Sequence, residues 1–328
     1  MPKNTLHRDR LEEMLEYANY RTPAEYVAKI VENAERANNS SMTQFGVQFT
    51  KAATHVNTFA ELKDTDAHIV GLSMEALSNI YAENADNILD LYDILDDYRS
   101  KYNLYNYVQY PIYFENTTMM TADRVFEQYF DLDLIECDEN EVFVDCGCYD
   151  GETVHSFIRN YGTKYKRIYS YELIKEQYEN CKENLKDVPN LVLKNAGVAG
   201  EAGRFMTAEF GEGSRVVSQE SYEYWLGQGV SREKFNMEEL VRIDDDITEP
   251  ITFLKMDIEG AELPALKGAA NHIKNDKPKL AICLYHQPYD LWVIPKYIKA
   301  LRPDYKLYLR YTPSYTVQFP HEIIVFAV

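Results

Sequence analysis

The sequence contains no long apolar segment. A helix that spans a bilayer needs about 20 consecutive apolar residues, whereas the longest apolar runs here, such as Leu280 to Tyr285, are short and strand-like. The N-terminal residues MPKNTLHRDR are polar and charged, so they lack the apolar region of a secretory signal peptide. We therefore expect neither a membrane span nor secretion.

Positive charge is also scarce. The chain has 34 Lys and Arg residues against 53 Asp and Glu residues, which gives a formal net charge of −19. Nucleic-acid binding depends on Lys and Arg contacts with phosphates, and attachment to an anionic membrane needs the same charge. The composition therefore argues against a general nucleic-acid binder and against a protein that binds anionic membranes.

Several motifs with a defined chemistry are missing. The chain has neither the GxGxxG fingerprint of dinucleotide-binding proteins nor the GxxxxGK[ST] of a P-loop. CxxC spacing and the Cys/His spacing of a zinc site are also absent from its five cysteines, which are Cys137, Cys146, Cys148, Cys181 and Cys283. Thiols in a reducing cytosol are the simplest interpretation of this odd number. We predict a cytoplasmic protein without a dedicated metal site.

The chain has ample apolar material for a core. Its 328 residues are 45% hydrophobic, which predicts two domains, or one large α/β domain with an appendage. Residues 1–115 are typical of a mainly helical region. One helix is expected to start at Thr22-Pro23-Ala24-Glu25, where Thr is the cap, Pro takes the first helical position and Glu follows three residues after the cap. We predict that this region caps the rest of the protein, to bind an acceptor or to dock a partner.

Tyrosines are concentrated between Tyr102 and Tyr113, interleaved with Asn, Gln and Pro. A tyrosine ring combines apolar area with a polar tip, so such a surface suits stacking against a sugar or a peptide. Tyrosines in this pattern also pack half-buried between two layers. The sequence leaves both interpretations open.

Residues 116–328 predict a different architecture, in which strands alternate with helices. The strands are expected at 142–145, 168–171, 191–194, 253–256, 279–285, 305–311 and 322–328, and the intervening helices at 153–161, 174–186, 264–274 and 289–301. Such alternation is typical of a doubly wound parallel sheet. A short connection without a helix joins the last two strands and predicts an antiparallel edge. Residues 197–243 interrupt the alternation and predict a β-hairpin followed by a loop or short helix.

Two acids and a glycine turn mark the start of this region. The first strand ends at Asp145 and is followed by Gly147-x-x-x-Gly151, and the second strand ends at Glu172. Ligands of doubly wound sheets bind beyond the carboxyl ends of the strands, where glycine allows close approach and an acid accepts hydrogen bonds from ribose hydroxyls. A tight structural turn and an acid at a helix start are the alternative interpretation.

A second group of acids follows the fourth strand. Asp257, Glu259 and Glu262 lie within six residues, and this crowding costs electrostatic energy unless a ligand, metal or cation relieves it. Lys255 is the nearest cation in the sequence. The alternative is that Glu259 and Glu262 only favour the positive end of the following helix.

Three separate segments resemble the FkbM family of methyltransferases. They are Lys255-Met-Asp-Ile-Glu-Gly-Ala-Glu262 with Leu266-Lys-Gly268, Asp145-Cys-Gly147-Cys-Tyr-Asp150-Gly151, and Lys277-Pro-Lys-Leu-Ala-Ile-Cys-Leu-Tyr-His286 with Asp290-Leu-Trp. The resemblance covers about residues 138–328. It implies a seven-stranded, Rossmann-like class I methyltransferase sheet within 116–328, S-adenosylmethionine as cofactor, and methylation of a hydroxyl on a glycan or another small hydroxylated acceptor.

The resemblance also implies roles for individual residues. Asp145, Gly147, Tyr149 and Gly151 would face the methionine part of the cofactor, Thr153 its carboxylate, Glu172 the ribose, Asn195 and Ala196 the adenine, and Asp257 the sulfonium and the acceptor. Two positions depart from the family pattern. Tyr149 replaces the middle glycine of the commonest loop, and Arg310-Tyr311-Thr312 stands where many relatives have Arg-His-His.

A general base is expected, because a hydroxyl is a poor nucleophile until its proton is removed. His286 is the first candidate, since a neutral imidazole is available near pH 7, and Asp257 and Glu259 are alternatives. His286 could instead orient a carboxylate. A divalent metal on these three residues is conceivable, but no spacing demands one.

Two rival functions stay open at this stage. One is an N- or carboxyl-methyltransferase acting on a peptide or protein, which the acidic and tyrosine-rich surface would attract. The other is a non-catalytic module that binds the cofactor and docks a partner. The sequence defines neither the acceptor nor the oligomeric state.

Overall fold

The structure is a computed structural model that describes residues 6–36, 72, 74–113, 127–210, 213–312 and 322–328. The chain forms two compact units. The first comprises Met1–Gln128, Leu284–Lys296 and Lys306–Val325, and the second comprises Tyr129–Cys283, Tyr297–Tyr305 and Phe326–Val328. C-terminal segments contribute to both units, and the domain boundary between residues 115 and 116 stays a prediction.

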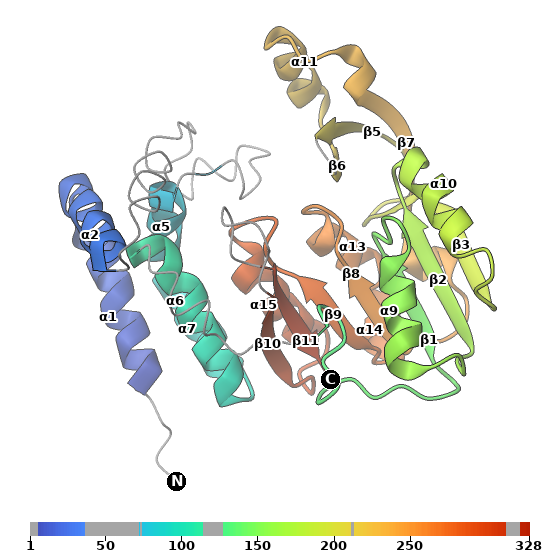
Figure 1. Cartoon of the computed structure of the whole chain (residues 1–328), viewed down its shortest axis with the longest axis horizontal. Helices are drawn as coiled ribbons and strands as arrows, with labels where there is room; N and C mark the ends of the chain where they lie inside the picture. Colours follow the sequence, from blue (N-terminus) through green and yellow to red (C-terminus); the bar gives the residue numbers. More distant parts are fainter. Residues whose placement is uncertain (1–5, 37–71, 73, 114–126, 211–212, 313–321) are drawn as a thin grey trace. The chain divides into compact units, whose positions relative to one another are not determined.

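The described N-terminal residues are helical, as the sequence predicts (Figure 1). The helices are α1 (Leu6–Tyr20), α2 (Pro23–Arg36), α5 (Met74–Glu83), α6 (Ala85–Ile94) and α7 (Tyr98–Tyr113). The expected start of α2 is confirmed. Glu25 N donates to Thr22 Oγ1 over 3.3 Å, and Thr22 N donates to Glu25 Oε2 over 2.7 Å, so each residue caps the other. Helix α1 packs against α5, α6 and α7.

The tyrosine-rich segment forms α7. Tyr107 and Tyr110 are each 3% exposed, and burial raises the pKa of both hydroxyls. The Tyr107 ring lies 6.4 Å from that of Tyr81, which in turn meets the Trp292 ring edge-on at 6.4 Å. Packing is therefore the role of these two tyrosines, whereas contact of the partly exposed ones with a ligand stays a prediction.

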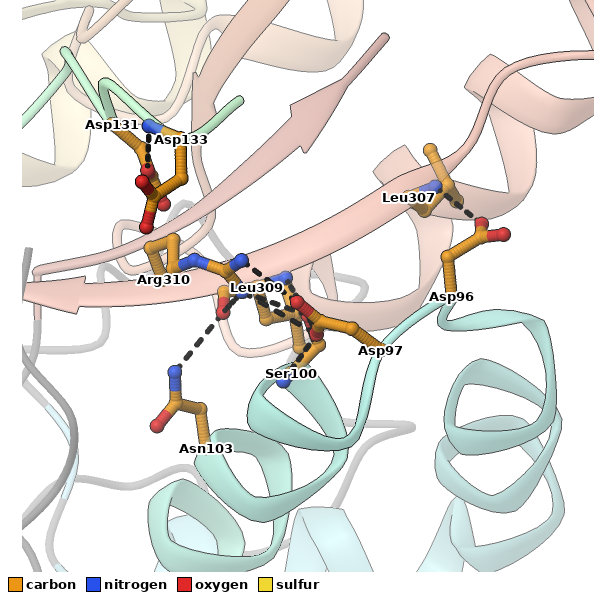
Figure 2. Close-up of polar contacts among 9 residues, drawn as sticks. All are labelled: Asp96, Asp97, Ser100, Asn103, Asp131, Asp133, Leu307, Leu309 and Arg310. Carbon is orange, nitrogen blue, oxygen red and sulfur yellow. Dashed lines mark hydrogen bonds and ion pairs between the residues drawn. The ribbon is translucent and has the colours of Figure 1, made fainter. Parts of the chain in front are cut away.

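Arg310, on β10 (Leu307–Thr312), binds side chains at the start of α7, as Figure 2 shows. Its guanidinium lies 2.8 Å from Asp97 Oδ2 and donates to Ser100 Oγ over 3.0 Å. Farther along α7, Asn103 Nδ2 donates to the carbonyl of Leu309 over 3.0 Å. Arg310 is 2% exposed. The arginine of the divergent Arg-Tyr-Thr segment thus has a structural role in this unit.

We expect Asp97→Asn to reduce the loss of stability in acid. Burial alone would raise the pKa of Asp97, but hydrogen bonds from Arg310 and Ser100 outweigh burial and lower it. A carboxyl with a lowered folded pKa contributes stability above its unfolded pKa of about 3.9 and loses it as pH falls through the folded value. Urea unfolding at pH 7 and at about pH 3 should therefore show a smaller difference for Asp97→Asn than for wild type.

Asp90→Asn is the control for that experiment. Asp90 pairs with Lys296 at 2.9 Å, but its side chain is 66% exposed, so its removal should leave the pH dependence as in wild type. An equal loss of unfolding free energy in acid for wild type and Asp97→Asn would contradict the prediction.

The larger sheet has the strand order β10-β11-β9-β8-β1-β2-β3. Its other strands are β1 (Val142–Cys146), β2 (Arg167–Glu172), β3 (Leu191–Asn195), β8 (Phe253–Met256), β9 (Lys279–Cys283) and β11 (Glu322–Ala327). β1 pairs in parallel with both β2 and β8, and β8 pairs in parallel with β9. The predicted doubly wound, seven-stranded mixed sheet with an antiparallel edge is confirmed.

Helices connect these strands, and aromatic side chains fill the core beside β1. The helices are α9 (Glu152–Tyr161), α10 (Lys175–Asn184), α12 (Ile243–Asp246), α13 (Glu262–Gly268), α14 (Ala270–Asn275) and α15 (Asp290–Leu301). The Phe143 ring stacks on Phe157 at 4.7 Å and lies 5.0 Å from Phe253. These rings join α9 to the centre of the sheet, and each fully buried ring contributes about 1.5–3 kcal/mol.

A second sheet occupies the expected insertion. Its order is β4-β7-β5-β6, formed by β4 (Gly197–Val198), β5 (Gly203–Phe210), β6 (Gly213–Val216) and β7 (Phe235–Val241), with α11 (Gln219–Gly227) and the 3₁₀ helix η2 (Arg232–Lys234) before β7. The predicted hairpin and short helix are confirmed, but β7 was not predicted. Its sequence FNMEELV lacks a clear alternation, and pairing with β5 makes it a strand.

Candidate active site

The predicted acids lie at the carboxyl ends of adjacent parallel strands. Asp145 is in β1 and Glu172 ends β2, and Asp257 directly follows β8. β1 lies between β2 and β8, the point at which the chain begins to build the sheet in the opposite direction. Doubly wound sheets bind ligands at this switch in strand order.

Asp145 forms a buried ion pair with Lys255. The two residues are register neighbours on β1 and β8, and Lys255 Nζ lies 3.0 Å from Asp145 Oδ1. Their side chains are 0% and 1% exposed. Burial alone would lower the pKa of Lys255, but Asp145 and Asp257 outweigh burial and raise it, so the ammonium stays charged. Burial raises the pKa of Asp145 despite Lys255. The sequence indicated Lys255 as the cation for Asp257, Glu259 and Glu262, but its ion pair is with Asp145, and Asp257 is the member of that group that also raises its pKa.

Lys255 also holds the turn that follows β1. Its ammonium donates to the carbonyl of Gly147 over 2.7 Å and to that of Cys146 over 3.3 Å. Within the described part of the chain, neither oxygen of Asp145 accepts an aligned hydrogen bond. Lys255 therefore couples the charge of Asp145 to the position of the turn.

Only glycine fits at position 147. Its φ is +81°, and an added Cβ would lie 1.9 Å from the carbonyl oxygen of Asp257. The amides of Gly147 and Cys148 donate to the carbonyl of Tyr171 over 3.0 and 3.2 Å. The turn is therefore held between the ends of β2 and β8, as close backbone approach requires.

Glu172 fixes the other side of the turn. Its carboxylate accepts the amide of Tyr149 on one oxygen and the amide of Ile174 on the other, each over 2.9 Å. Glu172 is 7% exposed, and this burial raises its pKa although both amides oppose the shift. Tyr149 has a φ of +51° and is 43% exposed, so its ring projects from the turn.

The remaining predicted cofactor residues lie on both sides of this turn. Gly151, with a φ of +93°, precedes α9, and Thr153 is partly exposed in the first turn of that helix. Asn195, at the end of β3, donates to the carbonyls of Glu172 and Leu173 over 2.9 and 3.0 Å. Ala196, next in the chain, is 5% exposed. Asn195 thus holds the backbone after Glu172.

Tyr129 is a member of the site that the sequence did not predict. Its hydroxyl donates to Asp257 Oδ2, and its ring centroid lies 4.7 Å from Lys255 Nζ. Tyr129 is 128 positions from Asp257 and precedes the strand-helix alternation, so neither spacing nor periodicity could reveal it.

The other two acids after β8 have different surroundings. Glu259 is exposed and has a φ of +58°, an uncommon conformation for a residue other than glycine. Glu262 is 0% exposed, and its Oε1 accepts the amide of Ile258 over 2.8 Å. Glu262 therefore stabilises the turn between β8 and α13 through this hydrogen bond, in addition to any favourable interaction with the positive end of α13.

His286 follows β9 and belongs to the first compact unit. It is 2% exposed, and its ring centroid lies 4.2 Å from that of Tyr285. The structure thus brings Asp145, Gly147, Glu172 and Asp257 together within the second unit.

The fold and these strand-end residues define the class I methyltransferase type of α/β protein. Residues 145–316, more than half of the chain, match the family model for the methyltransferase FkbM domain. The chain belongs to the FkbM methyltransferase family.

The chain is also similar to several solved structures. Methyltransferase FkbM from Methylobacillus flagellatus KT is 25% identical with a TM-score of 0.61; the match covers 76% of this chain and 60% of that one. An O-methyltransferase from Bacillus cereus in complex with SAH is 12% identical, with a TM-score of 0.35 and coverage of 58% and 74%. Fibrillarin from Aeropyrum pernix, with natively bound S-adenosyl-L-methionine, is 14% identical, with a TM-score of 0.33 and coverage of 60% and 70%.

A comparison with curated proteins gives no match. None of the helices in the described residues combines the length and the apolar character that a membrane crossing requires.

Proposed function

We propose that the protein transfers a methyl group from S-adenosylmethionine to a hydroxyl of a glycan or another small hydroxylated acceptor. The observation that carries this proposal is the pair of buried carboxylates, Asp145 and Glu172, on both sides of a turn where only glycine fits. Membership of the FkbM family supports a methyltransferase that uses this cofactor.

The residues present fit such a cofactor. Each oxygen of Glu172 accepts one amide hydrogen and keeps a second lone pair for a ribose hydroxyl. Gly147 lets the turn pass directly against the carbonyl oxygen of Asp257, which keeps the turn at the carboxyl ends of β1 and β8 where the ligand is proposed to bind. Asp145 is completely buried and paired with Lys255, which favours a role in positioning the turn. Thr153, Asn195 and Ala196 are proposed to border the ligand from the neighbouring elements.

Bound S-adenosylmethionine supplies an electrophilic methyl group on a sulfonium. The chain's contribution is to align the acceptor hydroxyl for in-line attack, to exclude water and to accept the hydroxyl proton. Asp257 accepts a hydrogen bond from the Tyr129 hydroxyl, which fixes the position of its carboxylate, and we assign it to orient the acceptor. His286 is our first candidate for the general base, with Glu259 as the exposed alternative.

Glu172→Gln is expected to weaken binding of S-adenosylmethionine by about 10- to 100-fold, because hydrogen bonds to a charged group are worth about 1.5–3 kcal/mol. The amide NH₂ would also face one of the two backbone amides that Glu172 now accepts. Thermal unfolding with and without the cofactor measures this effect. Cofactor at about 100 times its dissociation constant should stabilise wild type by about 2.7 kcal/mol, a shift of several degrees.

Glu249→Gln is the matched control for Glu172→Gln. Glu249 also accepts a hydrogen bond, from the Tyr169 hydroxyl over 2.9 Å, but it pairs with Arg167 at the start of β2, away from the carboxyl ends of the strands. Binding should be unchanged in this variant. A folded wild type that shows no shift with S-adenosylmethionine or S-adenosylhomocysteine would refute the proposed cofactor.

His286→Ala is expected to keep cofactor affinity and to lower kcat by about 100-fold or more, the usual contribution of a general base. The measurement is transfer of radiolabelled methyl groups from S-adenosylmethionine to a panel of methyl glycosides. An unchanged kcat would remove His286 from the role of base. Transfer to peptides in place of glycosides would favour a peptide methyltransferase.

A further inference from the structure

Two cysteines lie beside each other at the turn between β1 and α9. Cys148 lies in the turn, between Gly147 and Tyr149, and Cys181 lies on α10. Their Sγ atoms are 3.2 Å apart and share a thiol hydrogen bond. Both residues are buried, with 1% and 0% exposure.

The separation of the two sulfurs is close to that of a covalent link. A disulfide needs an S–S distance of about 2.05 Å, so the sulfurs must approach by only about 1 Å. Both thiols are free in the structure, and they belong to elements that β1 and β2 already hold side by side. Small rotations of the two side chains with a slight shift of the turn would bring them to bonding distance.

We propose that Cys148 and Cys181 are a redox modification site, which a peroxide converts to an intrachain disulfide that changes cofactor binding. The cofactor part of this inference rests on the proposed function. The disulfide itself does not depend on it.

The chemistry balances with hydrogen peroxide as the oxidant. One cysteine, as its thiolate, attacks a peroxide oxygen, the O–O bond breaks, and the sulfur becomes a sulfenic acid as one water forms. The second thiol attacks the sulfenic sulfur, the S–S bond forms, the S–O bond breaks, and a second water leaves. The cysteine pair loses two electrons and two hydrogens, and the peroxide gains them.

The surroundings of the two thiols determine how fast they are oxidised. The thiol hydrogen bond with Cys181, together with burial, raises the pKa of the Cys148 thiol, so little thiolate exists near neutral pH. Oxidation should therefore be slower than that of an exposed thiol and should accelerate as pH rises.

A disulfide at this place would displace the turn. Cys148 N donates to the carbonyl of Tyr171, and the next amide, that of Tyr149, donates to Glu172. A shift of about 1 Å in groups that position a ligand costs up to about 100-fold in function. We therefore expect oxidation to weaken cofactor binding by about 10-fold or more, and a thiol reductant to restore it.

The test uses the full chain treated with hydrogen peroxide, followed by peptide mapping under non-reducing conditions. Wild type should yield a linked Cys148–Cys181 peptide pair that lacks two hydrogens, and Cys148→Ser and Cys181→Ser should not. Cys137→Ser is the control and should form the same link, because Cys137 is outside the turn and only partly buried. The link should raise the Tm of wild type by several degrees, since it closes a loop of about 33 residues.

The outcomes separate this inference from the proposed function. Absence of the linked peptides, or pairing of either cysteine with a different one, would overturn the modification site. A link that leaves the affinity for S-adenosylmethionine unchanged would overturn its effect on the cofactor. If the reduced protein does not bind S-adenosylmethionine, the proposed function fails, whereas mapping of the linked peptides still decides whether the site exists.

Discussion

Lys255→Met is expected to lower the free energy of unfolding by about 3–5 kcal/mol, because it leaves the buried Asp145 without its cation. The same change removes the hydrogen bond to the Gly147 carbonyl and so releases the turn after β1. We therefore expect cofactor binding to be lost under conditions in which the variant is still folded. Urea unfolding measures the first effect, and calorimetric titration with S-adenosylmethionine measures the second.

Two further variants separate charge from position. Lys279→Met breaks another ion pair, in which Lys279 Nζ lies 2.7 Å from Glu141 Oε2. This pair lies at the amino ends of β9 and β1, whereas the candidate site lies at the carboxyl ends. It should cost stability but leave cofactor affinity unchanged. In the double variant Asp145→Leu/Lys255→Met, both charges are removed, and most of the lost stability should return because no unpaired charge remains. Cofactor binding should stay weak there, since the turn has lost its ammonium. Full recovery of binding would contradict a positioning role for Lys255.

Gly147→Ala is the second change with a large expected effect. Alanine at a φ of +81° costs about 1–2 kcal/mol in backbone energy. The added Cβ would also lie 1.9 Å from the Asp257 carbonyl oxygen, and displacing packed atoms costs typically about 1–3 kcal/mol more. We expect a loss of about 2–5 kcal/mol in the free energy of unfolding and about a 100-fold loss in cofactor affinity.

Gly162→Ala is the matched control, because alanine there has the same unfavourable φ but its Cβ contacts no other atom. Gly162 has a φ of +83°, and nothing lies within 4 Å of its added Cβ. Its cost should be only the backbone energy, about 1–2 kcal/mol, with cofactor affinity unchanged. Equal effects of the two substitutions on stability and affinity would show that the contact with the Asp257 carbonyl does not matter.

Local sequence signals were sufficient for most of the fold. The apolar runs around Phe143 and Leu254 predict buried parallel strands, and Thr22 with Glu25 predicts a helix start that the structure confirms. The site followed from the same signals. An acid that ends a parallel strand lies at the shared carboxyl edge of the sheet, so the sequence places Asp145 and Glu172 at the same edge.

Other features depend on partners that are distant in the sequence. β7 is a strand because β5 pairs with it, and nothing within its own residues required that pairing. Arg310 meets Asp97 across 213 positions, and a motif that differs from the family pattern gives no hint of this contact.

The sequence by itself determined the class of the sheet, the glycine turn and the acids at its edge, because periodicity, turns and strand ends are set by neighbouring residues. Only the tertiary structure decided which charges and hydroxyls are paired. It placed Lys255 between Asp145 and the turn, gave Asp257 the hydroxyl of Tyr129, and set Cys148 against Cys181. The physical reason is that these contacts form only when separate elements pack, and burial then makes each pairing energetically decisive.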